Sequence, residues 1–288
     1  MLGLASTLAT SLSDKVDNYA SLTGAHKNKV SVTLGTPEGG SVSFDDSRGN
    51  GIAFNSNYNT SSTFRGNFTV SCWYKTADGR SGDKATKSIA SISEGAGGAD
   101  IWDFSVASMG ALQASGSSNG DGQLAITLNQ YLADGAVDWT HLAWVVTGGG
   151  GSDTSVACYV NGVAATIINI QVISSTNHAA FNADNGLYVG SSGNVTTNGA
   201  SVAAGIVQND FIDDFCLHSS ALDANNIAEI GGGSGPINLL ANSGNYNASG
   251  DVVLYYKFNG ANDSSGCLLD SHGTSNGTGG QFSTESAS

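Results

Sequence analysis

The carboxylates of this chain do not follow the pattern that glycoside hydrolysis requires. A retaining glycosidase holds two carboxyl groups about 5–5.5 Å apart. Asp213 and Asp214 are consecutive in a strand-like run, so an extended backbone would direct their side chains to opposite faces. Asp100 and Asp103 are also out of phase along their run. The four glutamates are far apart in the sequence, at Glu38, Glu94, Glu229 and Glu285. These spacings argue against a glycosidase of that type.

The histidines show no catalytic or metal-binding motif either. All five occur singly, without HxH or HExxH spacing, at His26, His141, His178, His218 and His272. His141 lies inside the apolar run at 139–147, and His218 ends the run at 211–218. We interpret both as structural core histidines and expect that the protein is not an enzyme.

The charge balance bears on the partners that the protein can bind. Acidic residues outnumber basic ones by 24 to 10, which gives a formal net charge of −14. Phosphate backbones are bound by clusters of Lys and Arg, and Lys27 and Lys29 are the nearest approach to such a cluster. We therefore expect no nucleic-acid partner. No apolar run is long enough to span a bilayer, and residues 1–19 lack the basic start and continuous apolar core of a secretory signal.

The four cysteines contain no CxxC pair, and their three possible pairings cannot be separated by sequence. Cys72, Cys158 and Cys216 lie in apolar strand-like runs, where cysteine packs as a small hydrophobic residue. We predict buried thiols. The fourth cysteine is Cys267.

The elements that would position these side chains are mostly short strands. Forty glycines and only two prolines, with many Ser, Thr and Asn residues, are typical of tight turns between strands. Because only 12% of the residues are charged, the exposed strand faces must carry hydroxyl and amide groups. Asn161-Gly162 predicts a two-residue hairpin turn. The ranges expected to be strands are 30–34, 41–44, 68–75, 88–92, 101–107, 123–128, 139–147, 155–160, 164–170, 186–190, 211–218 and 252–258.

Two segments have helical spacing. Residues 219–233 predict a short helix with Ser220 or Asp223 as its N-cap and Gly231 as its stop. Its apolar face carries Leu222, Ile227 and Ile230. Residues 1–29 predict an amphipathic arm, with Leu4, Leu8, Leu12 and Val16 on one face, that docks on the body or on a partner. We divide the chain into this arm at 1–29, a sandwich domain at 30–282 and a flexible tail at 283–288.

Several segments together resemble the laminin G-like domains of the concanavalin A-like group, in particular the bacterial and viral branch. The resemblance covers residues 41–280, and the arm lies outside it. It implies an all-β fold: two curved antiparallel sheets packed as a jelly-roll sandwich, with one short helix. The segments that carry it are NFTVSCWYK (67–75), DWTHLAWVVTG (138–148), SVACYVNGV (155–163), GLYVGSS (186–192), FIDDFCLHSSALDANNIAEI (211–230) and VVLYYKFNGANDSSGCLLDSHGTSNGT (252–278).

The resemblance also implies a possible calcium site. Laminin G-like domains often bind Ca²⁺ at the sandwich rim through carboxylate, amide and carbonyl oxygens. The candidate ligands here are Asp213 and Asp214, Asp210, and Asp270 in the loop at 270–273. In the alternative, Asp213 or Asp214 orients loop backbone and Asp270 forms an Asx-turn.

Two functions fit these features. The first is a virion protein without catalytic activity, most plausibly of a bacteriophage, that decorates the capsid or forms part of a tail or fibre. It would contact other virion proteins, work within an oligomer or assembly, and adhere to glycans or a host surface. The alternative is a lectin-like carbohydrate-binding module outside any virion, extracellular or at a cell surface. Its candidate sugar-stacking platforms are Tyr58, Trp102, Tyr131 and Tyr246.

Overall fold

The computed structural model describes about half of the chain. The described ranges are 30–33, 41–44, 52–53, 66–75, 87–93, 100–106, 111–118, 122–131, 139–148, 155–165, 167–172, 186–190, 211–233, 235–257 and 271–272. The predicted arm at 1–29 and tail at 283–288 lie outside these ranges, so the predicted division into domains stays a prediction.

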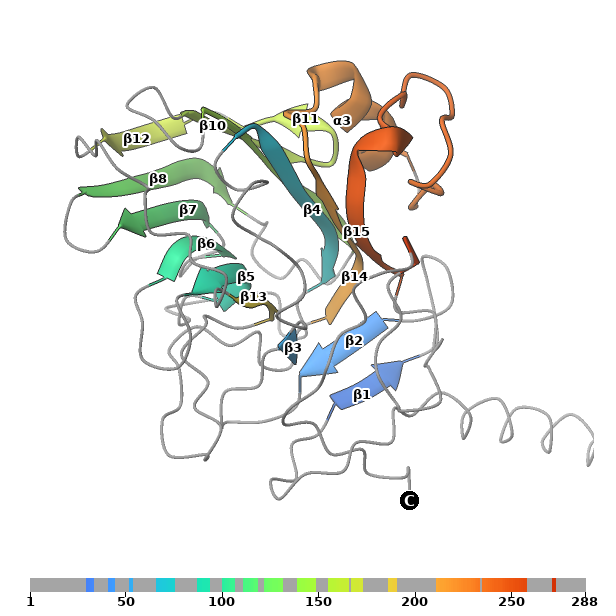
Figure 1. Ribbon diagram of the computed structural model, residues 1–288, viewed down its shortest axis with the longest axis horizontal. Helices are drawn as coiled ribbons and strands as arrows, with labels where there is room; N and C mark the ends of the chain where they lie inside the picture. Colours follow the sequence, from blue (N-terminus) through green and yellow to red (C-terminus); the bar gives the residue numbers. More distant parts are fainter. Residues whose placement is uncertain are drawn as a thin grey trace, which may run out of the picture.

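The strands form two antiparallel sheets that face each other, as Figure 1 shows. We call the eight-stranded sheet the β14 sheet. Its strand β15 (Val252–Tyr256) pairs with β14 and lies outside the linear order of the other seven strands. That main order is β1 (Val30–Thr33), β2 (Ser41–Phe44), β14 (Phe211–His218), β4 (Phe68–Lys75), β9 (Thr140–Thr147), β10 (Ser155–Val160) and β11 (Val163–Ala164).

The second sheet has seven strands, and we call it the β6 sheet. Its order is β12 (Ile167–Val172), β8 (Gly122–Tyr131), β7 (Ala111–Ser118), β6 (Asp100–Val106), β5 (Lys87–Ser93), β13 (Gly186–Val189) and β3 (Ile52–Ala53). The two sheets confirm the predicted all-β, antiparallel two-sheet sandwich.

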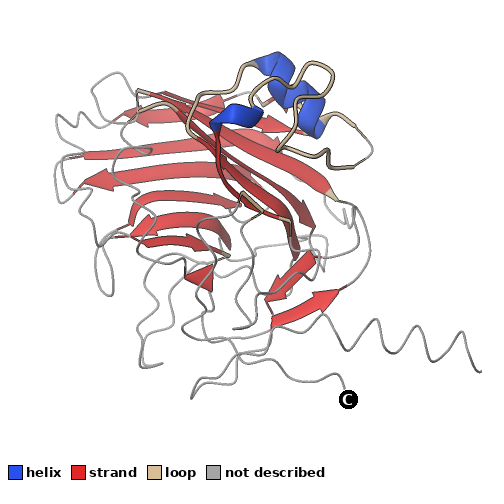
Figure 2. Ribbon diagram, turned by 45° about the vertical axis from the view of Figure 1, so that its right-hand side comes forward, coloured by secondary structure: helices blue, strands red, loops and turns tan. Residues whose placement is uncertain are grey.

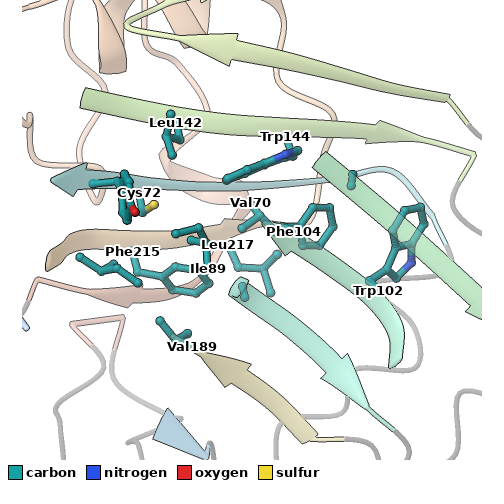
Figure 3. Close-up of a cluster of buried hydrophobic side chains, with 14 of the residues drawn as sticks. Val70, Cys72, Ile89, Trp102, Phe104, Leu142, Trp144, Val189, Phe215 and Leu217 are labelled. Atoms are coloured by element: carbon teal, nitrogen blue, oxygen red, sulfur yellow. The ribbon is translucent and has the colours of Figure 1, made fainter. Parts of the chain in front are cut away.

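The space between the sheets is filled by alternate side chains from both of them (Figure 3). The rings of Trp102 and Phe104 on β6 stack with centroids 5.6 Å apart. Phe68 on β4 meets Trp102 edge-on at 5.7 Å, an arrangement that aromatic quadrupoles favour. Because these residues recur at every second position, each strand contributes one apolar face to this core.

A second apolar layer covers the outer face of the β14 sheet. Residues 219–251, which we call the covering segment, contain helix α3 (Ala224–Gly231) and the 3₁₀ helix η2 (Ser249–Asp251). Figure 2 shows these helices on the outside of the strands. The members of the layer on the sheet and on the covering segment are Ala143, Val145, Cys216, Leu222, Ile227, Ile230, Leu239, Tyr246, Ala248, Val252 and Tyr255. Strands β9, β14 and β15 are therefore packed on both faces.

Local sequence signals account for the ends of these elements. Asp223 caps α3, since its side chain accepts a hydrogen bond from the Asn226 backbone N–H at 2.8 Å. Gly231 is the last helical residue, close to the predicted stop. Asn161 and Gly162 have φ values of 49° and 76°, as a type I′ turn requires, and confirm the predicted hairpin.

Candidate functional site

The predicted calcium ligands on β14 lie at a β-bulge and not at an open rim. The pairing of β14 with β4 shifts register between Asp213 and Cys216, and Asp214 has a left-handed φ of 47°. Asp213 Oδ1 accepts a hydrogen bond from the Asp214 backbone N–H at 2.9 Å. The Tyr255 hydroxyl donates to Asp214 Oδ1. Both carboxylates are buried. The Asp213 carboxylate thus orients the backbone of Asp214, which is the structural role that the sequence analysis gave as the alternative to calcium binding.

The other predicted ligands, Asp210 and Asp270, lie outside the described residues. Among the residues that are described, no group of three or more His, Cys, Asp or Glu side chains could hold a metal ion. Calcium binding stays a prediction.

The cysteines within the described ranges are buried and form no disulfide with one another, as predicted, at Cys72, Cys158 and Cys216. Burial raises the pKa of Cys72 and Cys158 well above the usual range, because the thiolate is poorly solvated inside the core. The charge of Asp213 raises the pKa of Cys72 further. A nucleophilic cysteine needs the opposite environment. Cys267 lies outside the described residues.

A buried polar cluster lies between β14 and the covering segment. The Tyr246 hydroxyl donates its one proton to the Leu239 carbonyl oxygen at 2.8 Å. His218 Nε2, 2.9 Å from the same hydroxyl, must therefore carry a proton and donate it. His218 Nδ1 is then an acceptor, and the Cys216 thiol lies 3.7 Å away as its donor.

This cluster has the residue types of a Cys–His nucleophile pair, but no substrate can reach it. His218 and Cys216 are both 0% exposed. Burial lowers the pKa of His218 to about 4, and the charge of Asp251 opposes this shift only in part. The imidazole is neutral at physiological pH and links the covering segment to the sheet, which agrees with its predicted structural role.

His141 on β9 is the second buried histidine at this interface. Its ring meets Trp73 edge-on at 5.5 Å, and among the described residues its Nδ1 has no hydrogen-bond partner. Burial, and to a lesser extent His218, lowers the pKa of His141 to about 3. A Cβ added to Gly231 would overlap with the His141 ring and lie 2.8 Å from the Gly162 backbone nitrogen. The end of α3 therefore packs directly on the β9–β10–β11 hairpins.

Further hydrogen bonds fasten the start and end of the covering segment to the sheet. Thr69 Oγ1 on β4 donates to the Ser220 carbonyl oxygen at 2.8 Å and accepts from the Leu222 N–H at 3.0 Å. The Ser220 hydroxyl donates to Asp251 Oδ2 at 2.7 Å. With the apolar layer inside these bonds, the outer face of β9, β14 and β15 is covered by the chain itself.

The outward face of the β6 sheet has the opposite character. Its described outward side chains on β5, β6 and β7, which we call the polar face, are Ser88, Ser91, Asp103, Ser105 and Gln113. Strand pairing sets Ser91 beside Asp103, Ser88 beside Ser105, and Ser105 beside Gln113. Such cross-strand neighbours have Cβ atoms about 5 Å apart. The described side chains of this face are polar, but its three serines are buried, so the expectation that hydroxyl groups cover the exposed faces stays a prediction.

Two members of the polar face reach solvent. Asp103 and Gln113 are partly exposed, whereas Ser88, Ser91 and Ser105 are buried. The Ser88 hydroxyl donates to Asp103 Oδ1 and so orients the carboxylate. The Asp103 carboxylate accepts hydrogen bonds, and the Gln113 amide both donates and accepts them. The sequence interpretation singled out neither residue as a candidate, although the alternation of Trp102 and Phe104 with Asp103 indicates which side of β6 faces outward.

Two of the predicted sugar-stacking platforms are wrong. Trp102 is 0% exposed because it points into the core, and Tyr246 is 0% exposed beneath the covering segment. Tyr58 and the side chain of Tyr131 lie outside the described residues. Stacking on Trp102 or Tyr246 would need either ring to leave its packed position.

Comparison with known proteins finds similarity only among solved structures. No protein-family model matches the chain, and no curated protein matches it significantly. A crystal structure of a putative carbohydrate-binding protein from Bacteroides ovatus is 15% identical over 88% of this chain, with a TM-score of 0.46. This chain spans 56% of that protein's length.

Two further solved structures show the same distant similarity. The sialidase module CBM40 from Ruminococcus gnavus is 14% identical over 66% of this chain and 96% of its own, with a TM-score of 0.45. A SAP-like pentraxin from Limulus polyphemus is 13% identical over 76% of this chain and 82% of its own, with a TM-score of 0.38. The function proposed below depends on this chain's own side chains.

Within the described ranges, no helix has the length and apolar character needed to cross a membrane.

Proposed function

We propose that this protein is a non-catalytic glycan-binding module that takes its ligand on the polar face of the β6 sheet. The observation that carries the proposal is the contrast between the two sheets. The outer face of β9, β14 and β15 is apolar and covered by the chain itself. The described outward side chains of β5, β6 and β7 are all polar: the three serines are buried, and Asp103 and Gln113 are partly exposed.

The chemistry of these groups suits sugar hydroxyls. A hydroxyl both donates and accepts hydrogen bonds, so it pairs well with a carboxylate that accepts and an amide that does both. Asp103 lies two residues from Ser105 on β6, and Gln113 lies opposite Ser105 on β7. Rigid strands hold such groups in place before the ligand arrives, which lowers the entropic cost of binding.

The absence of catalysis is part of the proposal. Hydrolysis of a glycosidic bond needs a second carboxyl group facing the first, at about 5–5.5 Å for retention and 6.5–9.5 Å for inversion. Of the described side chains on the polar face, Asp103 is the one carboxylate. The buried Cys216 and His218 cannot substitute for it, since the covering segment excludes substrate from them.

The virion role predicted from the sequence stays a prediction. It depends on the arm at 1–29, which lies outside the described residues, and on the order of the sequence motifs. The glycan-binding proposal is favoured because it depends on side chains whose positions are described. The two are compatible, since a glycan-binding module can be part of a virion and contact a host surface.

A glycan array followed by calorimetry on two variants tests the proposal. Gln113→Ala removes an amide from the polar face and should weaken binding of an array hit about tenfold, the value of one or two hydrogen bonds. Glu229→Gln, on the covering segment, keeps an oxygen that can accept from the Asn245 N–H and should bind as the natural protein does. An array without hits, or equal affinity of both variants, would overturn the proposal.

A further inference from the structure

The covering segment is joined to the sandwich at one place. It follows His218 at the end of β14 and ends at Asp251, just before Val252 at the start of β15. His218 and Val252 are paired across these two antiparallel strands, so the chain leaves the sheet and returns to it at the same point. The segment can therefore swing away from the sheet while β14 and β15 stay paired.

The covering segment is also hydrogen-bonded to itself. The Asn226 side-chain oxygen accepts from the Asn247 backbone N–H at 2.9 Å. The Glu229 carboxylate accepts from the Asn245 backbone N–H at 3.2 Å. Both bonds join α3 to the loop that precedes η2, and neither involves the sheet. The segment can therefore move as one body.

Two buried histidines lie where the segment meets the sheet. His218 Nε2 donates to the Tyr246 hydroxyl at 2.9 Å, and the His141 ring packs against Gly231 at the end of α3. Burial lowers the pKa from 6.5 to about 4 for His218 and to about 3 for His141, because a charged ring is poorly solvated there. Both rings are therefore neutral while the segment is in place.

The other titratable groups around these rings do not reverse the effect of burial. The Cys216 thiol lies 3.7 Å from His218 Nδ1. Asp251 on the covering segment favours the charged form of His218, but by less than burial disfavours it. His218 in turn disfavours a charge on His141. The remaining titratable groups buried on β14 and next to the covering segment are Asp213, Asp214, Tyr246 and Tyr255.

We propose that the covering segment is an acid-sensitive lid, which lifts from the sheet as the pH falls while the two-sheet sandwich stays folded. The lifted state exposes both imidazoles to water, so they take up protons that the covered state excludes. A charged ring cannot return beneath the apolar layer without losing its hydration. Acid therefore favours the lifted state, and a return to neutral pH closes it.

Thiol labelling at pH 7.5 and pH 5 tests the lid, with the labelled cysteines identified by peptide mass spectrometry. Cys216 is buried beneath the covering segment, whereas Cys72 and Cys158 are buried between the two sheets. The reagent is 4,4′-dithiodipyridine, which reacts with thiols at both pH values. Each labelling rate is divided by the rate of the same cysteine in the urea-unfolded protein at the same pH.

The expected result is early labelling of Cys216 alone. Its corrected rate should rise at least about thirtyfold at pH 5, the factor for one histidine at 1.5 pH units below its ordinary pKa of 6.5. Cys72 and Cys158 should react at least about tenfold more slowly than Cys216, because they are reached only by opening of the sandwich.

Two substitutions show whether the buried ring causes the pH dependence. His218→Gln removes the titrating ring and keeps an amide that can donate to the Tyr246 hydroxyl. It should reduce the rise at pH 5 by at least about tenfold. His272→Gln makes the same change at an exposed position and should leave the rise intact.

Three results would overturn the lid. Equal labelling rates of Cys216, Cys72 and Cys158 at pH 5 would show that acid unfolds the whole sandwich. A Cys216 rate that does not change with pH, or a rise that His218→Gln leaves intact, would remove the role of the histidines. The order of labelling in the natural protein needs no substitution, so it tests the lid even if His218→Gln fails to fold. Glycan binding, proposed for the other sheet, is tested separately.

Discussion

Removal of the Tyr246 hydroxyl is the most demanding test of how the covering segment is held on the sheet. Tyr246→Phe removes that hydroxyl and leaves the buried ring nearly unchanged in shape. In the natural protein the hydroxyl donates to the Leu239 carbonyl oxygen at 2.8 Å and accepts from His218 Nε2 at 2.9 Å. The substitution therefore deprives two buried groups of a partner with a single change.

The expected cost follows from those two groups. A buried donor or acceptor that loses its partner costs about 1–3 kcal/mol. Tyr246 and His218 are both 0% exposed, so water cannot replace the lost hydroxyl without opening the covering segment. We expect the free energy of unfolding to fall by about 3 kcal/mol.

Urea unfolding followed by tryptophan fluorescence measures this change, with Tyr159→Phe as the matched control. Tyr159 packs at the edge of the same apolar layer but makes no hydroxyl hydrogen bond to the described residues. Its substitution should change the free energy by less than about 0.5 kcal/mol. If Tyr246→Phe and Tyr159→Phe unfold with equal free energies, the reasoning about the buried cluster is refuted.

Three further predictions concern the same interface. Burial lowers the pKa of His141 to about 3 and of His218 to about 4, from 6.5, so as pH falls the unfolded chain takes up protons first. The free energy of unfolding should fall below pH 6.5, by about 2 kcal/mol for each histidine at pH 5, and equal urea midpoints at pH 7.5 and 5 would contradict this. Gly231→Ala should lower the melting temperature by several degrees, because its Cβ has no space against His141; an unchanged melting temperature would show that this packing is loose. If calcium binds at Asp213 and Asp214, EGTA should lower the melting temperature, and an unchanged value counts against the site.

Much of the fold is predictable because single strands carry local signals. Alternation in FTVSCWYK places Val70, Cys72 and Tyr74 inward, and the observed strand has the predicted bounds 68–75. The hairpin at Asn161-Gly162 depends only on two residues that tolerate positive φ. These features are decided by neighbours in sequence.

Other features depend on partners that are distant in sequence. The sequence predicts that the side chains of Asp213 and Asp214 point to opposite faces, which holds only for an extended backbone. The β-bulge at these residues interrupts the extended backbone. Asp214 has a left-handed φ and accepts a hydrogen bond from Tyr255. Strand β7 was missed because ALQASGSS has little apolar alternation, and pairing with β6 and β8 supplies its structure.

The burial of the outer face of β9 has a signal in the sequence, but a search for alternating apolar and polar residues does not detect it. In β9 the residues from Leu142 to Val146 are apolar without interruption, which is typical of a strand buried on both faces. Ala143 and Val145 indeed lie under the covering segment. The candidate site depends on the same observation. Asp103 and Gln113 can be recognised as candidates only when the cover over the other sheet is known.

Hydrogen exchange with and without a saturating bound glycan tests the central claim most directly, because it reports both faces of the sandwich in one measurement. The account predicts slower exchange in peptides from β5, β6 and β7, within 87–118, and unchanged exchange in 219–251. Slower exchange in 219–251, with none in 87–118, would contradict it.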